Sequence, residues 1–356
     1  MNRPNTSSRP ARFRPGTGTL AAAAFLVAFL SLGLGRYGLT PSEVAHALWL
    51  GFCGKFGAGF GLGSNPPTPD ELTAVRIVWD VRLPRVALAF MAGGGLAAAG
   101  AALQAVFRNP LVDPHVIGVT SGAAFGGALA ILAGSSALTL GASAFVFGLA
   151  ALGIVGLAAA SCGRQDRLFV VLAGIIVAGI FSALVALLQY VADAEETLPS
   201  IVFWLMGSFA SANADRALAA CPGIAVAVGI LWRMRWHLNL LGLDERDAAS
   251  LGVRILPMRR AVLFLSAWIT ALQVGVSGSI GWVGLVVPHL ARLAVGTDYR
   301  RALPASFWIG AGFMVVVDDA ARTLTAAEIP LGILTALAGA PVFAVLLWRN
   351  RGKLRE

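Results

Sequence analysis

The stretch GSIGWVGLVVPHLARL, Gly278 to Leu293, carries glycines at positions 278, 281 and 284 and contains the pair Pro288-His289. Each glycine in a helix costs about 1 kcal/mol relative to alanine, so three on one face would destabilise a water-soluble core helix. In lipid the hydrophobic effect between helices is weak, and small residues let helix backbones approach closely. The stretch therefore predicts a membrane-spanning helix, Gly278 to Val295, with a face of small residues.

The composition of the chain supports a membrane protein. Its 356 residues are 57% hydrophobic and 13% charged, with 42 glycines and a mean hydropathy of +0.78, whereas soluble domains average about 25% charged residues. The cysteines are too few and too scattered for a disulfide framework or a zinc site, and we expect them to pack as small apolar residues. They are Cys53, Cys162 and Cys221.

Long uncharged runs recur along the chain. A spanning helix needs roughly 20 mainly apolar residues, and ten runs approach that length. The first follows basic residues, like a signal peptide, but no convincing cleavage site comes after it, so we expect a retained helix. The expected spans are Gly18 to Leu34, Val86 to Phe107, Val116 to Leu132, Thr139 to Cys162, Leu168 to Val191, Ala217 to Trp232, Ala261 to Val276, Gly278 to Val295, Leu303 to Val317 and Leu331 to Trp348.

These runs predict an all-α, polytopic membrane protein with a single transmembrane domain over residues 18–348. Residues 1–17 and 349–356 form tails. Pro199 to Ala212 is shorter and holds Gly207, which favours a half-helix or re-entrant element. A Gly- and Pro-rich stretch over residues 61–85 reads as an external loop. The glycines Gly118, Gly122 and Gly126, four apart, predict a smooth helix face.

The basic residues predict the orientation. Most of the 27 Lys and Arg residues fall in the tails and in the loops after the second, fourth, sixth and eighth spans. Because basic loops stay on the cytoplasmic side, both termini are expected in the cytoplasm. The high pI of 10.6 is then a topology signal and does not require a nucleic-acid partner.

The sequence offers no catalytic constellation. It has no phosphate-binding glycine loop, so we expect no nucleotide hydrolysis by this chain. Its four histidines are isolated in sequence, so no metal site is expected. Ion-coupled carriers keep ionisable groups within their spans, and here the nearest candidates are Asp318, Asp319 and Arg322, of which Asp318 and Arg322 can pair along one helix. A pore that moves a large solute without ion coupling needs another source of energy, so a partner that supplies it is expected.

The inner loop, residues 239–260, is the expected contact for that partner. Leu243 to Leu251 is a short amphipathic stretch, and Gly252 follows it as a C-cap signal. Pro257 breaks the chain before the next span. A short helix lying along the membrane, with acidic and small residues exposed, would suit a cytoplasmic partner; a solvated loop without a partner is the alternative.

Several stretches resemble the FecCD family of ABC-importer permeases. They are RLPR from Arg82, LQAVFRNPLVDPHVIGVTSGAAFG from Leu103, DAASLGV from Asp247, GSIGWVGLVVPHLAR from Gly278 and IPLGILTALAGAPVFAVLL from Ile329. The resemblance implies a BtuC-like permease fold in the bacterial inner membrane. It also implies a homodimer with the path on the dimer axis, two cytoplasmic ATPase subunits and a periplasmic binding protein.

The resemblance also assigns residues to roles. Docking of the binding protein would use Arg82, Arg85 and Arg322, with Arg82 and Arg85 facing outward together. Coupling to the ATPase would use Leu243, Asp244, Asp247, Ala248, Ala249, Leu251 and Gly252. The path and gate would include Leu168, Leu172, Ile176, Ser200, Trp204, Pro288 and His289, with Pro288 bending or ending its helix near the gate.

The chain most resembles the haem permeases, so haem is the expected cargo, with ferric siderophore and cobalamin as alternatives. No single residue decides between them. Two other classes stay open: an ion-coupled secondary carrier, which would need ion-pathway charges, and a membrane scaffold or sensor that stimulates no ATPase.

Overall fold

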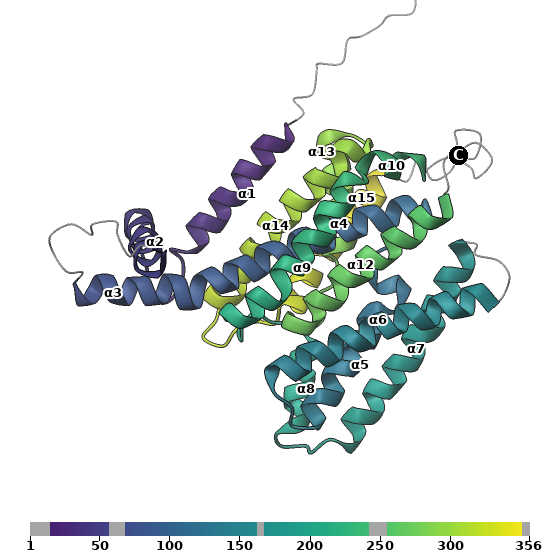
Figure 1. Ribbon diagram of the computed structural model, residues 1–356, viewed down its shortest axis with the longest axis horizontal. Helices are drawn as coiled ribbons and strands as arrows, with labels where there is room; N and C mark the ends of the chain where they lie inside the picture. Colours follow the sequence, from purple (N-terminus) through teal and green to yellow (C-terminus); the bar gives the residue numbers. More distant parts are fainter. Residues whose placement is uncertain (1–14, 57–67, 162–166, 242–254, 351–356) are drawn as a thin grey trace, which may run out of the picture.

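The structure is a computed structural model that describes residues 15–56, 68–161, 167–241 and 255–350, and every regular element in these ranges is a helix (Figure 1). Six of the described helices are long and apolar enough to cross a membrane, counting α3, η1 and α4 as one continuous helix. They are Pro69–Phe107, α6 (Ala137–Ser161), α7 (Arg167–Val191), α9 (Ala214–Arg233), α12 (Ile255–Ser277) and α14 (Tyr299–Thr323).

Four shorter apolar helices complete the set of ten expected spans. They are α1 (Thr17–Ser31), α5 (Val119–Leu132), α13 (Val283–Val295) and α15 (Leu331–Asn350). The shorter elements α8 (Thr197–Leu205), α10 (Arg235–Leu240) and η2 (Pro114–Ile117) lie between them. The all-α expectation is confirmed, and α8 falls where the sequence predicted a half-helix.

Helix α4 (Leu83–Phe107) is the centre of the bundle. It packs against α9, α12, α13 and α14, and almost every side chain beyond its first turn is buried. Its small residues permit this. A Cβ added to Gly100 would lie 2.0 Å from the carbonyl oxygen of Gly284 in α13, and one added to Gly93 would lie 2.3 Å from that of Gly310 in α14. These backbone contacts are the packing that small residues allow in lipid.

Helices α5, α6 and α7, with α8, form a group that lies beside the rest of the bundle (Figure 1). The expected glycine face of α5 is confirmed for Gly122 and Gly126, whose added Cβ atoms would lie 2.6 Å and 2.5 Å from carbonyl oxygens of α6. Gly118 is instead the residue before the helix, with a φ of 77°. Helix α12 joins the group to the bundle, since it packs against both α6 and α9.

The stretch expected as an external loop is partly helical, so that prediction was wrong. Helix α2 (Pro41–Phe56) precedes it, and α3 (Pro69–Arg76) continues through a π-helix, η1 (Ile77–Arg82), into α4. The cause is a capping box at Thr68: its hydroxyl accepts from the Glu71 N–H, and the Glu71 carboxylate accepts from the Thr68 N–H. Such a reciprocal cap stabilises a helix start, and Pro69 at the first helical position is compatible with it.

The helix expected from Gly278 begins only at Val283, so that boundary was wrong too. Gly278 has a φ of 70° and Trp282 one of 71°, and a non-glycine residue with positive φ is uncommon. Of the three glycines in the opening stretch, only Gly284 lies on a helix. Residues 278–282 form an irregular connection instead of a smooth helix face.

Candidate translocation site

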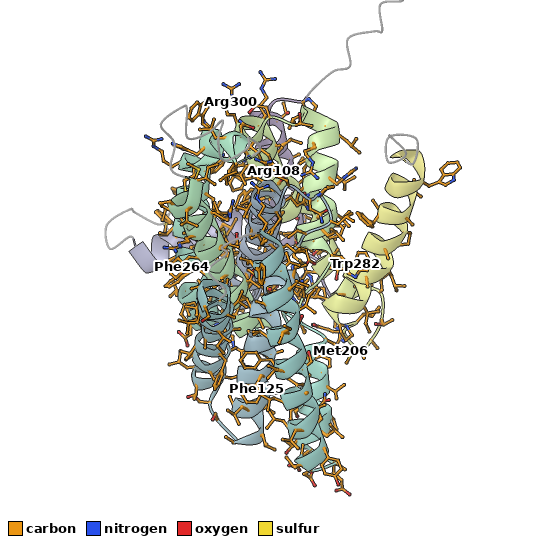
Figure 2. All side chains as sticks on the ribbon, turned by 90° about the vertical axis from the view of Figure 1, so that its right-hand side faces the viewer. Arg108, Phe125, Met206, Phe264, Trp282 and Arg300 are labelled. Carbon is orange, nitrogen blue, oxygen red and sulfur yellow. The ribbon has the colours of Figure 1, made fainter. Side chains whose placement is uncertain are left out.

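Two helices end and a third begins at one place in the fold. Helix α8 ends at Leu205, α12 ends at Ser277, and α15 begins at Leu331. Their loose ends bond to one another: the Ser208 N–H donates to the Ser277 carbonyl at 2.8 Å, and the Leu331 N–H to the Gly207 carbonyl at 2.8 Å. Buried backbone groups in lipid must be satisfied in this way. We call residues 206–208, 277–282 and 330–332 the junction; Met206 and Trp282 mark it in Figure 2.

Glycines let the three segments of the junction approach one another closely. A Cβ added to Gly278 would lie 2.0 Å from the Trp204 carbonyl oxygen, one added to Gly207 would lie 2.6 Å from that of Ser279, and one added to Gly332 would lie 2.6 Å from that of Met206. Because these contacts are to backbone, no side-chain movement could relieve them. The junction thus joins three non-consecutive segments through close main-chain contacts.

Helix α15 otherwise stands apart, as Figure 2 shows beside Trp282. Within the described residues it packs against parts of α13 and α14, and it also meets Trp282, whose Cβ lies 2.8 Å from a Cβ built on Gly339. Its outward face is apolar and exposed, including Leu337 and Val345. Helix α15 is thus held at one end by the junction and has fewer contacts with the bundle than the central helices have.

The expected path residues on α7 lie on its unpacked face. Leu168, Leu172 and Ile176 are 62%, 46% and 63% exposed in the subunit. Their spacing of four places them on one side of the helix, opposite the buried Val170, Gly174 and Val177. An apolar face this long needs lipid or a second protein surface to cover it, so the geometry is compatible with a path-lining role, which stays a prediction.

The expected path residues on α8 differ from each other. Ser200 is exposed, with its hydroxyl bonded to the Glu196 carbonyl at 2.8 Å. Trp204 instead packs inside the subunit: a Cβ on Gly127 would lie 2.0 Å from its indole ring, which joins a cluster with Ala123 and Val274. Trp204 is partly buried and anchors α8 on α5 in this conformation, and its path-lining role stays a prediction.

Pro288 does not end its helix, and the other expected effect, a bend in the helix, stays a prediction. It is buried in the middle of α13, which continues to Val295. His289 is partly buried, and its Nε2 has no hydrogen-bond partner in the described part of the chain. Nearby, Arg292 Nη1 donates to Gln104 Oε1 at 2.7 Å, linking α13 to α4. Sequence reasoning missed this link, although a glutamine within the apolar run of α4 was a signal for it.

The three arginines assigned to docking are occupied within the subunit. Arg85 makes a double fork, with bonds of 2.8–3.1 Å to Asp318 and of 2.8–2.9 Å to Glu328. Arg82 is buried and donates to the backbone carbonyls of Leu32 and Tyr37. Arg82 and Arg85 thus point to different partners, and the expectation that they face outward together was wrong.

Arg322 is engaged as well. It donates to the carbonyls of Leu34 and Ser31 at 2.8 Å and pairs with Asp319. Its contact with Asp318, the expected pairing along the helix, is longer, at 3.9 Å. A docking role for the three arginines stays a prediction, and it would require these contacts to be exchanged for contacts with a partner protein.

The residues expected to couple to an ATPase fall within 242–254, outside the residues that the structure describes. Among the described residues, no group of three or more His, Cys, Asp or Glu side chains could hold a metal ion. What the described chain offers is a junction where α8, α12 and α15 end or begin, and exposed apolar faces on α7 and α15.

Comparison with known proteins bears on the family of this chain. A sequence model of the FecCD transport family matches residues 23–349. The molybdate import permease MolB of Haemophilus influenzae is 46% identical over 334 residues, covering 93% of this chain and 95% of that protein. The hemin transport permease HmuU of Yersinia pestis is 38% identical over 293 residues, covering 81% and 87%.

A solved structure described as an inward-facing conformation of an ABC transporter superposes with a TM-score of 0.81 at 44% identity, covering 94% of this chain and 98% of that one. The family match spans nearly the whole chain, and the relatives are permease components, which are membrane-embedded and not themselves catalytic. This chain belongs to the FecCD transport family and is an ABC-importer permease.

Proposed function

We propose that this chain forms a homodimeric path for a binding-protein-dependent importer, energised by two cytoplasmic ATPase subunits. The junction carries the proposal. It ties α8 and the α12–α13 connection to the start of α15, and the subunit also carries exposed apolar faces on α7 and α15. A second copy placed against these faces would cover them and enclose a path between the two subunits.

In this proposal α15 is the moving part of the gate. It is held by the junction, by the contact between Gly339 and Trp282, and by packing against parts of α13 and α14. ATP binding and hydrolysis in the partner would shift α15 against Trp282. Because packed contacts switch between discrete arrangements, a small shift there could open or close the path.

The segment from Leu243 to Gly252 is proposed as the site that receives this movement from the ATPase. Gly252→Val should lower uptake and binding-protein-stimulated ATP hydrolysis while leaving the yield of the assembled complex unchanged. The measurement is both rates in proteoliposomes. Normal uptake at normal complex yield would contradict the assignment.

For the cargo we propose molybdate or a similar oxyanion. The support is the molybdate permease, which is more similar to this chain and covers more of it than the haem permease does. The sequence-based expectation of haem has less support from these relatives. It remains the second candidate, with a ferric chelate, because the haem permease and an iron chelatin permease of Helicobacter pylori at 37% identity are also relatives.

Uptake in cells lacking this chain decides between these cargoes. Molybdenum content at nanomolar external molybdate should fall and be restored by the native chain, while growth on haem or on a ferric siderophore as sole iron source should not change. Loss of growth on haem with normal molybdenum content would establish the iron complex instead. No change in any of these would contradict both.

A further inference from the structure

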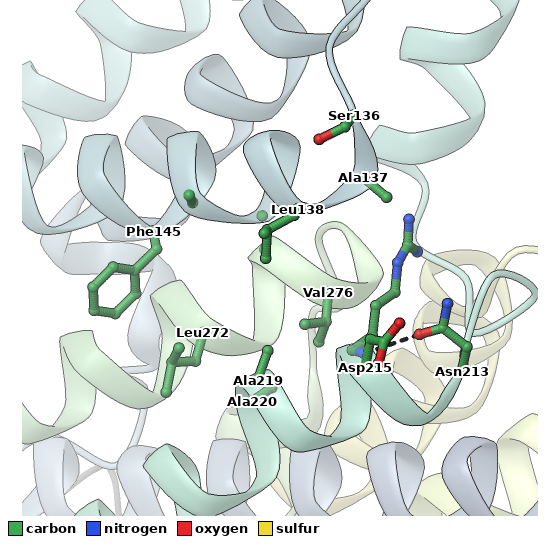
Figure 3. A pocket seen from close by; sticks show the side chains of 14 residues that line it. Ser136, Ala137, Leu138, Phe145, Asn213, Asp215, Ala219, Ala220, Leu272 and Val276 are labelled. Atoms are coloured by element: carbon green, nitrogen blue, oxygen red, sulfur yellow. Dashed lines mark hydrogen bonds between the residues drawn. The ribbon is translucent and has the colours of Figure 1, made fainter.

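A cavity of about 440 Å³ lies where α6 and α9 begin and α12 ends (Figure 3). This volume falls in the range of roughly 300–1,000 Å³ typical of small-molecule sites. Apolar side chains form its walls, and they come from all three helices. The wall residues are Leu138, Phe145, Ala219, Ala220, Leu272 and Val276.

The mouth of this cavity carries two charges that are not paired with each other. Asp215 and Arg216 both line it, next to Asn213, which caps α9 by accepting from the Arg216 N–H at 2.9 Å. The Arg216 side chain donates only to the Ser211 hydroxyl, and within the described ranges no carboxylate forms an ion pair with it. Asp215 is exposed and has no side-chain partner there.

These two charges differ from those of Arg85 and Arg322, which have partners within the subunit. Arg85 and Arg322 are enclosed by carboxylates and carbonyl oxygens of their own subunit. At the cavity, a guanidinium and a carboxylate stand side by side along the chain, each able to take an external partner. The helices that line the cavity, α6, α9 and α12, are among the six that can cross a membrane. The two charges therefore lie at a helix end, at the level of the lipid headgroups, and the apolar walls lie at the depth of the acyl chains.

We propose that this cavity binds one phospholipid with a primary-amine, zwitterionic headgroup, of the phosphatidylethanolamine type. The Arg216 guanidinium holds the phosphate, which its planar fork suits. The Asp215 carboxylate accepts from the ammonium group. One acyl chain fills the space between Leu138 and Leu272. A purely anionic headgroup would satisfy Arg216 but would leave Asp215 facing a like charge.

The bound lipid would add to the contact between α6 and α12. At this end of α6 and α12 their backbones meet at Gly141 and Gly275, and a Cβ added to Gly275 would lie 2.8 Å from the Gly141 carbonyl oxygen. Both glycines line the cavity. An acyl chain there would contact α6, α9 and α12 together and so join the α5–α8 group to the rest of the bundle.

Native mass spectrometry of the purified chain tests the site. The protein is incubated in mild detergent with equal amounts of phosphatidylethanolamine and phosphatidylglycerol that carry identical acyl chains. The native chain should retain one phosphatidylethanolamine per subunit in preference to phosphatidylglycerol. Arg216→Gln should reduce retention of both lipids by about tenfold, the loss of one charge-assisted contact. Asp215→Asn should abolish the preference and leave the two lipids equal.

Ala219→Trp, which fills the cavity, should remove the retained lipid, whereas Arg300→Gln, at an exposed pair distant in sequence, should leave it in place. If Ala219→Trp does not fold, the two shape-conserving variants decide alone. Equal retention by the native chain and Arg216→Gln would overturn the site. Preference of the native chain for phosphatidylglycerol would overturn the headgroup assignment.

Discussion

Arg85→Gln should destabilise the subunit more than any exposed charge substitution. The Arg85 side chain is 11% exposed and its partner Asp318 is 1% exposed. Removal of the guanidinium leaves the Asp318 carboxylate buried without its main counter-charge. Breaking a buried pair from one side costs about 3–5 kcal/mol. It also frees Glu328, two residues before the Pro330-Leu331 start of α15, so the start of α15 should loosen.

The assay is reversible unfolding by SDS in mixed micelles, followed by tryptophan fluorescence. Arg300→Gln is the matched control, because Arg300 and Asp298 are 60% and 35% exposed and such pairs contribute at most about 1 kcal/mol. The double variant Arg85→Gln with Asp318→Asn should regain most of the loss, since it removes the unpaired charge. An Arg85→Gln variant as stable as Arg300→Gln would refute the reasoning.

Two further predictions concern packing and pH. Gly100→Ala should lower folded yield, because its Cβ would meet the Gly284 backbone at 2.0 Å, whereas Gly153→Ala, with nothing within 4 Å, should be neutral or slightly stabilising in thermal unfolding. The Arg300 guanidinium, with the Arg300 N–H, holds the pKa of Asp298 below its ordinary value, so the carboxylate stabilises the start of α14 at neutral pH. That contribution to stability is present above the unfolded-state pKa of about 3.9 and is lost as the pH falls through the folded-state pKa. Asp298→Asn should therefore be less stable than the native chain at pH 7 and equally stable in acid. A stability difference that stays constant at all pH values would contradict this.

The ten membrane helices could be predicted because each needs only a long apolar run, a local property of the sequence. The missed starts of α2 and α3 share one local signal, a Thr-Pro-x-Glu pattern at Thr40 and Thr68. In both, the glutamate side chain accepts from the threonine N–H at 2.7 Å. Reading these stretches for glycine and proline content alone concealed the capping boxes.

The pairing of Arg85 with Asp318 and Glu328 could not be predicted in the same way. The partners lie 233 and 243 residues away, and only the packing of α4 against α14 brings them together. The junction is similar. Its glycines are visible in the sequence, but their role depends on backbone contacts between α8, α12 and α15, so a helical face was the simpler reading of Gly278.

The most direct test of the gate is a disulfide between α15 and the junction. The variant combines Trp282→Cys with Gly339→Cys in a chain without Cys53, Cys162 and Cys221. The Trp282 Cβ and a Cβ built on Gly339 are 2.8 Å apart, so a relaxation of about 1 Å brings the two Cβ atoms to disulfide spacing. Uptake of the cargo is measured in proteoliposomes with the ATPase and binding protein, before and after reduction, with each single variant as control. If α15 must move against Trp282, the oxidised double variant should be inactive and the reductant should restore uptake. Undiminished uptake with the disulfide fully formed would contradict the account.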